Sequence, residues 1–223
     1  METQLILTRD GSHSLYVPDL DEQYHSLAGA VTESKHVFIQ NGYRQILQED
    51  SLHVFEVGFG TGLNAWLTLL EAHQEKKKTV YHSIELFPLN NSTIKSLNYN
   101  NFSSGAVNLK PRDLHEAEWN EDILVSDWFR FRKIQDDLLR YKLENNFYHV
   151  VYFDAFAPDK QPELWTEEIF IKMYNGLRDK GILVTYSCKG SVRRLLQSIG
   201  FLVSRIPGPP GGKKEMIRAE KTG

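Results

Sequence analysis

The sequence is poor in cysteine, and its histidines are dispersed. Cys188 is the single cysteine among 223 residues, and the eight histidines occur one at a time between His13 and His149. Disulfide frameworks and zinc sites both need ligands that recur at characteristic spacings. The sequence therefore excludes a disulfide scaffold and a zinc module, and we expect no bound metal.

Long apolar runs are also lacking. No stretch approaches the roughly 18 consecutive apolar residues that identify a membrane-spanning helix. Met1 is followed by polar residues, whereas a signal peptide has a basic and then an apolar segment. With 41% hydrophobic and 25% charged residues, the chain has the composition of an ordinary globular domain. We expect a cytoplasmic protein with no membrane partner.

Charge is distributed unevenly along the chain. Residues 1–177 contain 16 Lys and Arg against 26 Asp and Glu, whereas residues 178–223 contain 10 against 3. A basic segment on an acidic body is one signature of nucleic-acid binding, because phosphates are neutralised locally. Uneven placement of solvated surface charges produces the same asymmetry, so both interpretations stay open.

Apolar segments alternate with amphipathic ones over most of the chain. Two short apolar runs around Asp10 and Gly11 predict a β-hairpin, and residues 19–50 predict one or two short helices. The rest predicts strands at 52–57, 79–85, 129–135, 147–153 and 181–187, helices at 63–73, 88–101, 163–177 and 191–199, and two strands around a loop at 207–212. Such alternation predicts an α/β fold with a parallel sheet covered on both faces. We divide the chain into an N-terminal extension, residues 1–50, packed on a main domain, residues 51–223.

The turn after the strand at 52–57 has the pattern Glu-x-Gly-x-Gly-x-Gly. Alternate glycines let the backbone turn sharply and approach a ligand, and the next helix presents free N–H groups at its start. A dinucleotide fingerprint needs Gly or Ala where Leu63 stands. The pattern is instead the first motif of Rossmann-like, class I S-adenosylmethionine-dependent methyltransferases; a tight turn without a ligand is the alternative. We expect donor contacts from Glu56, Gly58, Phe59, Gly60, Thr61, Gly62 and Asn64.

Acidic residues follow the next strands, at the sheet edge where ligands of open α/β folds bind. Glu85 ends the strand at 79–85, and we expect it to accept hydrogen bonds from both ribose hydroxyls of the donor. Asp136 and Asp137 follow the strand at 129–135. We prefer Asp137 as the contact of the adenine amino group, and a helix N-cap is the alternative.

Asp154 follows the strand at 147–153 in the segment Asp-Ala-Phe-Ala-Pro. This segment resembles the Asn/Asp-Pro-Pro-aromatic loop with which amino-group methyltransferases hold a target nitrogen beside the donor. An alkylamine is mostly protonated at neutral pH and then has no lone pair for attack. A carboxylate that takes this proton, or orients the neutral amine, contributes about 10² to 10⁴ in rate. We expect Asp154 to be the catalytic residue and also to contact the donor; a helix cap is the alternative.

Several less common sequence motifs also occur in a fixed order, at residues 33–39, 58–64, 85–89, 154–158, 162–165, 190–194, 200–201 and 213–216. In these motifs, and over nearly its whole length, the chain resembles the methyltransferase domain of the tRNA wobble-uridine modification enzymes MnmC, or MnmD where that domain stands alone. The resemblance implies methyl transfer from S-adenosyl-L-methionine, which becomes S-adenosyl-L-homocysteine. The acceptor it implies is the exocyclic amine of 5-aminomethyl-2-thiouridine at the tRNA wobble position, giving 5-methylaminomethyl-2-thiouridine.

The resemblance also implies partners. Bifunctional members carry a flavin-dependent oxidase domain in addition to the methyltransferase domain. Since the resemblance is to the methyltransferase domain, we expect no flavin in this chain, and a separate flavin-dependent oxidase is a candidate partner. The tRNA anticodon stem-loop is the expected substrate. We expect phosphate contacts from the basic side chains of Arg193, Arg194, Lys213 and Lys214. We expect base stacking from the aromatic side chains of Phe156 and Trp165. For the two aromatic residues a position in the core is the alternative.

Two other classes of function stay open at this point. An aminopropyltransferase-like protein, or another small-amine methyltransferase, uses the same fold but needs a polyamine pocket and no basic rim, which the basic segment at 178–223 disfavours. A non-catalytic RNA-binding module is disfavoured by the complete set of Glu56, Glu85 and Asp154.

Overall fold

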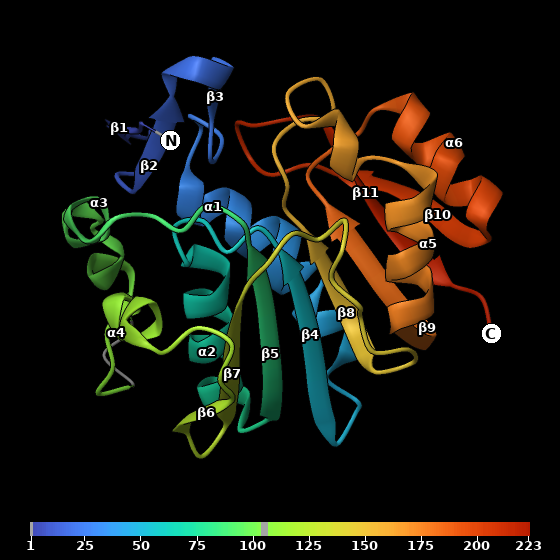
Figure 1. Ribbon diagram of the computed structural model, residues 1–223, viewed down its shortest axis with the longest axis horizontal. Helices are drawn as coiled ribbons and strands as arrows, with labels where there is room; N and C mark the ends of the chain where they lie inside the picture. The colour runs from blue at the N-terminus through green and yellow to red at the C-terminus, as the bar shows by residue number, and fades with distance from the viewer. Residues whose placement is uncertain (1, 104–106) are drawn as a thin grey trace.

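The protein is an α/β structure built on one large sheet (Figure 1). The computed structural model describes residues 2–103 and 107–223. Within these ranges the strands form an eight-stranded sheet of order β10-β11-β9-β8-β4-β5-β7-β6 and a three-stranded sheet of order β1-β2-β3. The strands are β1 (Gln4–Leu7), β2 (His13–Val17), β3 (Glu22–Gln23), β4 (Ser51–Val57), β5 (Lys78–Glu85), β6 (Ile123–Ser126), β7 (Phe129–Gln135), β8 (Tyr148–Phe153), β9 (Leu177–Thr185), β10 (Phe201–Pro207) and β11 (Glu215–Lys221).

Helices and helical turns connect the strands. The α-helices are α1 (Ala30–Ser34), α2 (Leu63–Glu75), α3 (Asn91–Ser96), α4 (Pro111–Glu116), α5 (Glu167–Gly176) and α6 (Gly190–Ile199). A π-helix, η2 (Lys35–Gln40), continues α1, and 3₁₀ turns occur at η1 (Pro18–Leu20), η3 (Tyr43–Ile46), η4 (Tyr99–Phe102) and η5 (Pro162–Leu164). None of the helices in the described ranges combines the length and apolarity that a membrane crossing needs.

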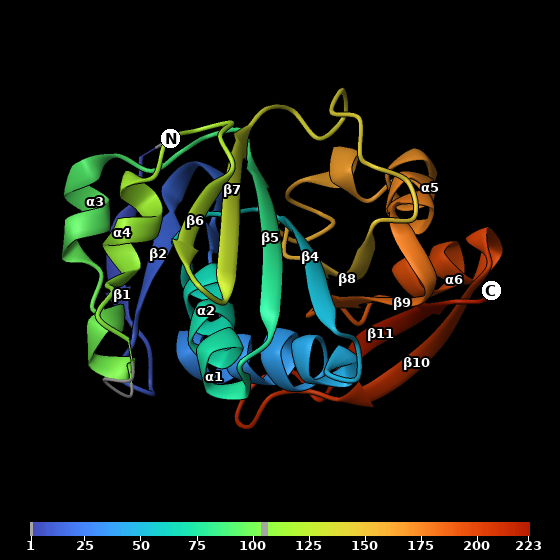
Figure 2. The same cartoon turned by 90° about the horizontal axis from the view of Figure 1, so that it is seen from below.

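The central strands separate two hydrophobic cores. Val150 and Tyr152 of β8 pack in one core with α2 and η2, whereas Val151 and Phe153 pack in the other with α5 and α6. Figure 2 shows these helix pairs on opposite sides of the sheet. Side chains of a strand alternate between faces, so a strand buried on both faces becomes a continuous apolar run. For this reason the apolar segment at 147–153 is recognisable as a strand in the sequence.

The strand directions partly match the expectation of a parallel sheet. Strands β4, β5, β7, β8 and β9 run parallel. At the edges, β11 pairs antiparallel with β9, β10 with β11, and β6 with β7, so the expectation is wrong there. Short connections join β6 to β7 and β10 to β11 and permit antiparallel pairing, whereas parallel pairing needs a long crossover. The chain crosses from β9 through α6 to β10, and β11 then returns between these two strands.

The order of the sheet reverses between β4 and β8. From β4 the chain builds outward to β5 and β7, and it then returns to place β8 on the opposite side of β4. Ligands of open α/β sheets bind outside the carboxyl ends of the strands at such a reversal. The turns that leave β4 and β8 are therefore the place where the fold provides a site.

The helix expected at 88–101 is shorter than predicted and begins later. The Asn90 side-chain oxygen accepts a hydrogen bond from the backbone N–H of Thr93 at 2.9 Å, which is the N-cap arrangement. Leu97 is already extended, so α3 ends after Ser96. The predicted start at residue 88 is wrong because the Asn90 cap sets the start at Asn91.

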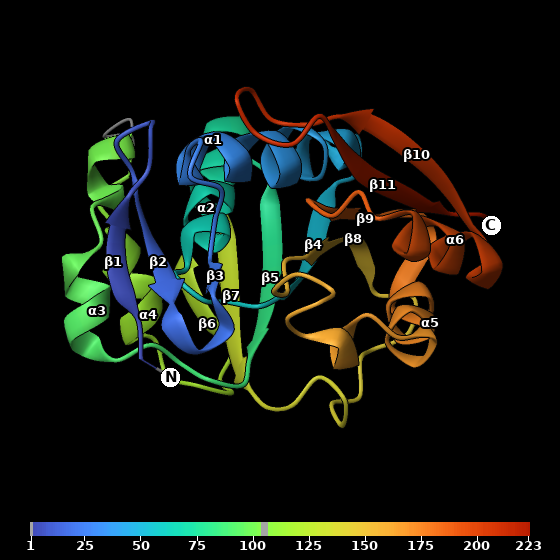
Figure 3. The same cartoon turned by 90° about the horizontal axis from the view of Figure 1, so that it is seen from above.

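The N-terminal residues contact the large sheet and the helices around it. Val37 and Phe38 of η2 are buried in the same core as α2 and β4. The backbone N–H of His13 donates to the Asn98 side-chain oxygen at 2.8 Å, and Figure 3 shows β1 and β2 beside α3 and α4. Residue 1 of the expected extension lies outside the described residues, and the division after residue 50 stays a prediction.

His149 is a buried histidine held neutral by the fold. Its Nδ1 accepts a hydrogen bond from the backbone N–H of His53 at 3.0 Å, and only 6% of the residue is exposed. Burial lowers the pKa of His149 to about 4, and the positive charges of Arg178 and His53 act in the same direction. The usual pKa of histidine is 6.5, and the pKa in the folded protein is lower. The contribution of His149 to stability is therefore fully present above pH 6.5 and is lost as the pH falls toward 4, because the unfolded chain binds the proton first.

We predict that His149→Asn makes the free energy of unfolding less dependent on pH, since the asparagine oxygen can still accept from the His53 N–H. Between pH 7 and pH 5 the parent should lose about 1 to 2 kcal/mol more than the variant. Urea unfolding at both pH values measures this difference, and the comparison separates His149 from the other groups that titrate in the same range. Equal losses in the two proteins would contradict the assignment.

Candidate active site

A cleft of about 480 Å³ opens where β4, β5, β7 and β8 end. Its walls include the glycine turn after β4, the residues that follow β5, β7 and β8, and part of the N-terminal segment. This volume lies within the range of small-molecule sites. The cleft lies at the reversal of strand order, as the topology leads one to expect.

Glycines are required in the turn after β4. Gly58 has a φ of +91°, and a Cβ atom added to it would lie 2.9 Å from the backbone oxygen of Asp154. Gly62 has a φ of +71°, and its added Cβ would lie 2.8 Å from Nε2 of His115. Both backbone conformations are unfavourable for residues with a side chain. The turn therefore folds closely against the end of β8 and against α4.

Glu85 lies in the wall of the cleft, held by the turn itself. Its Oε2 accepts a hydrogen bond from the backbone N–H of Gly60 at 3.0 Å, and its Oε1 accepts from that of Phe87 at 2.8 Å. A carboxylate has lone pairs for about four hydrogen bonds. Glu85 can thus accept further hydrogen bonds from a ligand, such as those of a ribose, without losing the two that fix it.

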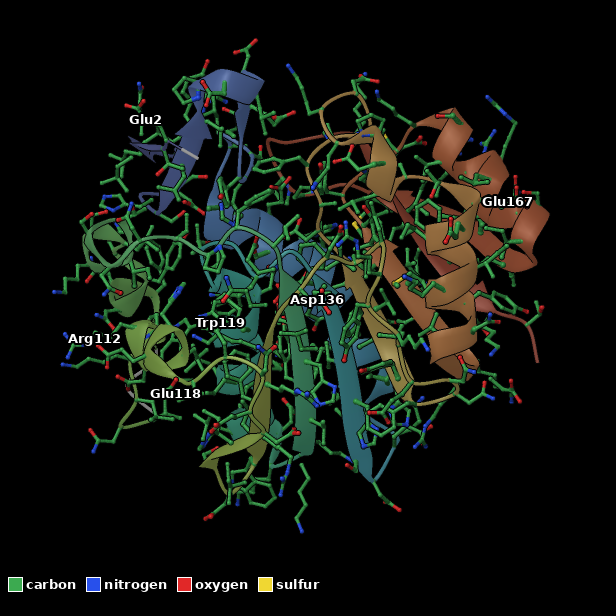
Figure 4. All side chains as sticks on the ribbon, in the orientation of Figure 1. Glu2, Arg112, Glu118, Trp119, Asp136 and Glu167 are labelled. Carbon is green, nitrogen blue, oxygen red and sulfur yellow. The ribbon has the colours of Figure 1, made fainter. Side chains whose placement is uncertain are left out.

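Asp136 and Asp137 both line the cleft. Figure 4 shows Asp136 on the segment that leaves β7 and crosses in front of the sheet. The Asp137 carboxylate accepts from the backbone N–H of Leu139 at 2.9 Å, so Asp137 also caps the following turn, as the alternative interpretation has it. The preference for Asp137 as the adenine contact stays a prediction.

Glu56 lies behind the glycine turn, and it is not among the residues that line the cleft. The residue is fully buried, and its Oε2 accepts a hydrogen bond from the Ser83 hydroxyl at 2.6 Å. Burial raises the pKa of Glu56 to about 8, and the negative charge of Asp154 adds to this effect. The expectation that Glu56 contacts the donor directly does not fit this placement, and the same holds for Gly62.

Asp154 projects into the cleft from the end of β8. The side-chain amide of Asn64, in the first turn of α2, donates to its Oδ2 at 2.7 Å. Burial raises the pKa of Asp154 to about 8; the charge of Glu33 acts in the same direction, and the Asn64 hydrogen bond and the charge of Lys213 oppose it. A pKa near the working pH suits a group that accepts a proton during a reaction.

The two predicted aromatic contacts have different positions. Phe156 lines the cleft, and its ring meets the ring of Tyr24 edge-on with centroids 5.1 Å apart. Trp165 is only 8% exposed and packs edge-on against Phe153, and its indole N–H donates to the backbone oxygen of Phe156 at 2.8 Å. The expected stacking of Trp165 on a base is therefore wrong, because its ring belongs to the core.

The predicted basic contacts lie outside the cleft. Arg193 and Arg194 are in the first half of α6, and Lys213 and Lys214 are exposed on the loop between β10 and β11. The Lys213 ammonium lies 4.2 Å from the centroid of the Tyr186 ring. Contacts of these side chains with RNA stay predictions.

Part of the cleft was not foreseen from the sequence. Gln23, Tyr24 and His25 line it from the N-terminal segment, and Tyr186 lines it from the end of β9. Tyr186 could have been found, because it follows a strand that ends at the same edge as β4 and β8. No local signal marks Tyr24, whose position depends on the folding of the N-terminal sheet.

The cleft fits a nucleoside donor with a positive charge. It combines a glycine-rich turn, a wall carboxylate, two aspartates beyond β7 and a half-buried acid beyond β8. In residues 2–103 and 107–223, no group of three or more His, Cys, Asp and Glu side chains is arranged to hold a metal ion. The site therefore offers carboxylates, backbone N–H groups and apolar surface to a ligand.

Comparison with known proteins gives the same class of ligand. Residues 114–222 match a family model described as S-adenosyl-L-methionine-dependent methyltransferase. The chain is 31% identical over 224 residues to the tRNA 5-methylaminomethyl-2-thiouridine biosynthesis bifunctional protein MnmC of Actinobacillus pleuropneumoniae, and 27% identical over 216 residues to that of a Marinomonas species. These matches cover 90% of this chain but only 32% and 31% of the relatives. The chain thus spans about a third of their length.

Solved structures share the fold. MNMC2 from Aquifex aeolicus superposes with a TM-score of 0.77 and 25% identity, over 98% of this chain and 70% of that chain. Spermidine synthase from Thermotoga maritima superposes with a TM-score of 0.57 and 14% identity, over 99% of this chain and 72% of that one. The second likeness shows the fold alone.

We predict that Glu85→Ala weakens the binding of S-adenosyl-L-methionine by about tenfold to a hundredfold, because hydrogen bonds to a charged group are lost. Titration calorimetry measures the affinity. Glu163→Ala is the matched control, since Glu163 is an exposed glutamate that also lines the cleft, and it should change the affinity less than twofold. An unchanged affinity for Glu85→Ala would place the ribose contact elsewhere.

Proposed function

Since the chain belongs to the S-adenosyl-L-methionine-dependent methyltransferases, with the methyltransferase domain of MnmC as its counterpart, we propose that it methylates a wobble uridine of tRNA. The acceptor is the exocyclic amine of 5-aminomethyl-2-thiouridine, and the product is 5-methylaminomethyl-2-thiouridine. The observation that carries this proposal is the half-buried Asp154 carboxyl, which borders the donor cleft and has a pKa raised to about 8.

The residues of the cleft bind and orient the donor. The glycine turn approaches it with backbone N–H groups, Glu85 binds the ribose, and Asp136 or Asp137 binds the adenine amino group. When bound, S-adenosyl-L-methionine supplies a methyl group that passes to the amine nitrogen while the carbon–sulfur electron pair stays on sulfur. Alignment of these reactants and exclusion of water account for much of the acceleration.

Asp154 prepares the acceptor amine. An ammonium has no lone pair, so it must give up one proton before it attacks. The Asp154 carboxylate takes this proton or accepts a hydrogen bond from the neutral amine, and the Asn64 amide holds the carboxylate in place. Because the pKa of Asp154 is raised to about 8, its affinity for a proton approaches that of an alkylamine more closely than an ordinary aspartate does.

The basic part of the RNA surface lies outside the cleft, whereas its aromatic residue, Phe156, lines the cleft. Arg193, Arg194, Lys213 and Lys214 supply positive charge for phosphates of the anticodon stem-loop, and Phe156 offers its ring to the wobble base. The acidic body of the chain leaves this C-terminal segment as the basic surface. A flavin-dependent oxidase, as part of the same pathway, acts before this step by removing a carboxymethyl group.

We expect the purified protein, given S-adenosyl-L-methionine, to methylate an anticodon stem-loop whose wobble residue is 5-aminomethyl-2-thiouridine. Mass spectrometry of the digested nucleosides should show the wobble nucleoside heavier by one methylene group. The same stem-loop with an unmodified wobble uridine is the control and should gain no mass. Absence of product from the aminomethyl substrate would refute the proposed function.

We predict that Asp154→Asn lowers kcat by at least about 10², with donor affinity within a few-fold of the parent. In the parent, kcat should rise with pH up to about 8, because the carboxylate form is the proton acceptor and its pKa is about 8. Single-turnover rates across pH 6 to 9 measure both effects. Asp159→Asn, at an exposed aspartate on the same loop, is the control, and a normal rate for Asp154→Asn would remove Asp154 from catalysis.

A further inference from the structure

A second cavity of about 410 Å³ adjoins the donor cleft. Gln23, Tyr24, His25 and Tyr186 line both spaces, so these side chains form the boundary between them. The two spaces therefore meet at these side chains, with Asp154 lining the first space and Glu33 lining the second.

Glu33 is a buried carboxyl that the donor site does not use. It lies on α1 and is 8% exposed, and its Oε2 accepts a hydrogen bond from the backbone N–H of Ser26 at 2.7 Å. Among the residues that the structure describes, its Oε1 has no hydrogen-bond donor. Burial raises the pKa of Glu33, and the Ser26 hydrogen bond and the charge of Lys213 oppose this. One oxygen thus stays available to a ligand in the cavity.

Tyr186 makes the place beside Glu33 favourable for a cation. Its hydroxyl donates to the backbone oxygen of Ala155 at 2.8 Å, which fixes the ring. The carboxyls of Asp154, Glu22 and Glu33 all act on Tyr186, and they raise its pKa together with burial, which is the larger cause. An aromatic face and nearby carboxylates attract the same kind of group, an ammonium.

Lys213 shows that an ammonium is accommodated there. Its Nζ lies 4.2 Å from the centroid of the Tyr186 ring, and its charge acts on both Glu33 and Asp154. Lys213 belongs to the exposed loop between β10 and β11. A long, exposed lysine side chain can withdraw to solvent, so a ligand ammonium can replace it without exposing a buried group.

We propose that the second cavity receives the acceptor nucleoside and that Glu33 binds its primary amine against the face of Tyr186. This inference rests on the proposed function, since it assigns the subsite for that acceptor. Glu33 and Asp154 then have separate tasks: Glu33 selects and orients the amine by accepting an N–H hydrogen bond, and Asp154 takes the proton. A uridine without the aminomethyl group leaves the Glu33 oxygen unpaired, which is how a buried polar group rejects an analogue.

The test compares two stem-loops that differ only in the wobble residue, 5-aminomethyl-2-thiouridine or 2-thiouridine, bound in the presence of S-adenosyl-L-homocysteine so that no turnover occurs. The parent should bind the aminomethyl stem-loop about tenfold to a hundredfold more tightly. In Glu33→Gln this ratio should fall to within about threefold of unity, because the neutral amide no longer pairs with an ammonium. The glutamine oxygen still accepts from the Ser26 N–H, so the local fold is retained.

Glu71→Gln is the matched control. Glu71 has the same 8% exposure as Glu33, but it pairs with Arg44 away from both cavities. This variant should keep the parental ratio. Both variants should bind S-adenosyl-L-homocysteine within twofold of the parent.

Tyr186 provides a second test that leaves Glu33 in place. Tyr186→Phe keeps the ring and should keep most of the discrimination, whereas Tyr186→Leu should lose it. The inference would be overturned if Glu33→Gln and Tyr186→Leu both kept the parental ratio of affinities for the two stem-loops. It would also be overturned if the parent bound the two stem-loops equally. If the parent methylates the aminomethyl stem-loop while these variants keep its ratio, the proposed function stands and the subsite assignment fails.

Discussion

The close approach of the β4 and β8 ends is the constraint on which the site depends. The backbone N–H of Asp154 donates to the oxygen of Val57 at 3.1 Å, and that of Gly58 donates to the oxygen of Ile84 at 3.0 Å. These hydrogen bonds extend the sheet into the turns that carry the reactive groups. A side chain at Gly58 would collide with the Asp154 backbone, so the glycine turn and the segment that carries Asp154 are packed as one unit.

The same packing explains why the carboxyl groups of the site have unusual properties. Glu56 and Asp154 lie near each other in the interior, and each is held by a hydrogen bond from a neutral side chain, Ser83 or Asn64. Removal from water favours the protonated form of a carboxyl group. In the proposed reaction, an acid beside a cationic donor and a cationic acceptor is thereby able to exchange a proton near neutral pH.

The N-terminal segment completes what the sheet begins. A Rossmann-like sheet by itself offers the glycine turn and the strand ends, but Tyr24, His25 and Glu33 come from residues that precede β4. Tyr24 and His25 line both the cleft and the second cavity, and Glu33 lines the second cavity. Under the proposed function, the residues that select the acceptor lie in a segment outside the donor-binding part, so the same fold can serve different acceptors.

The sequence by itself determined the central strands, the glycine turn and the acids that follow β5 and β8. Each of these has a local signal: an apolar run of strand length, alternate glycines, and an acidic residue directly after a strand. The tertiary structure alone decided that Trp165 is core, that Glu56 lies behind the turn, and that Tyr24 and Tyr186 line both the cleft with Asp154 and the cavity with Glu33. These outcomes depend on which surfaces pack together, and packing brings together residues far apart in the chain, a relationship that no local pattern records.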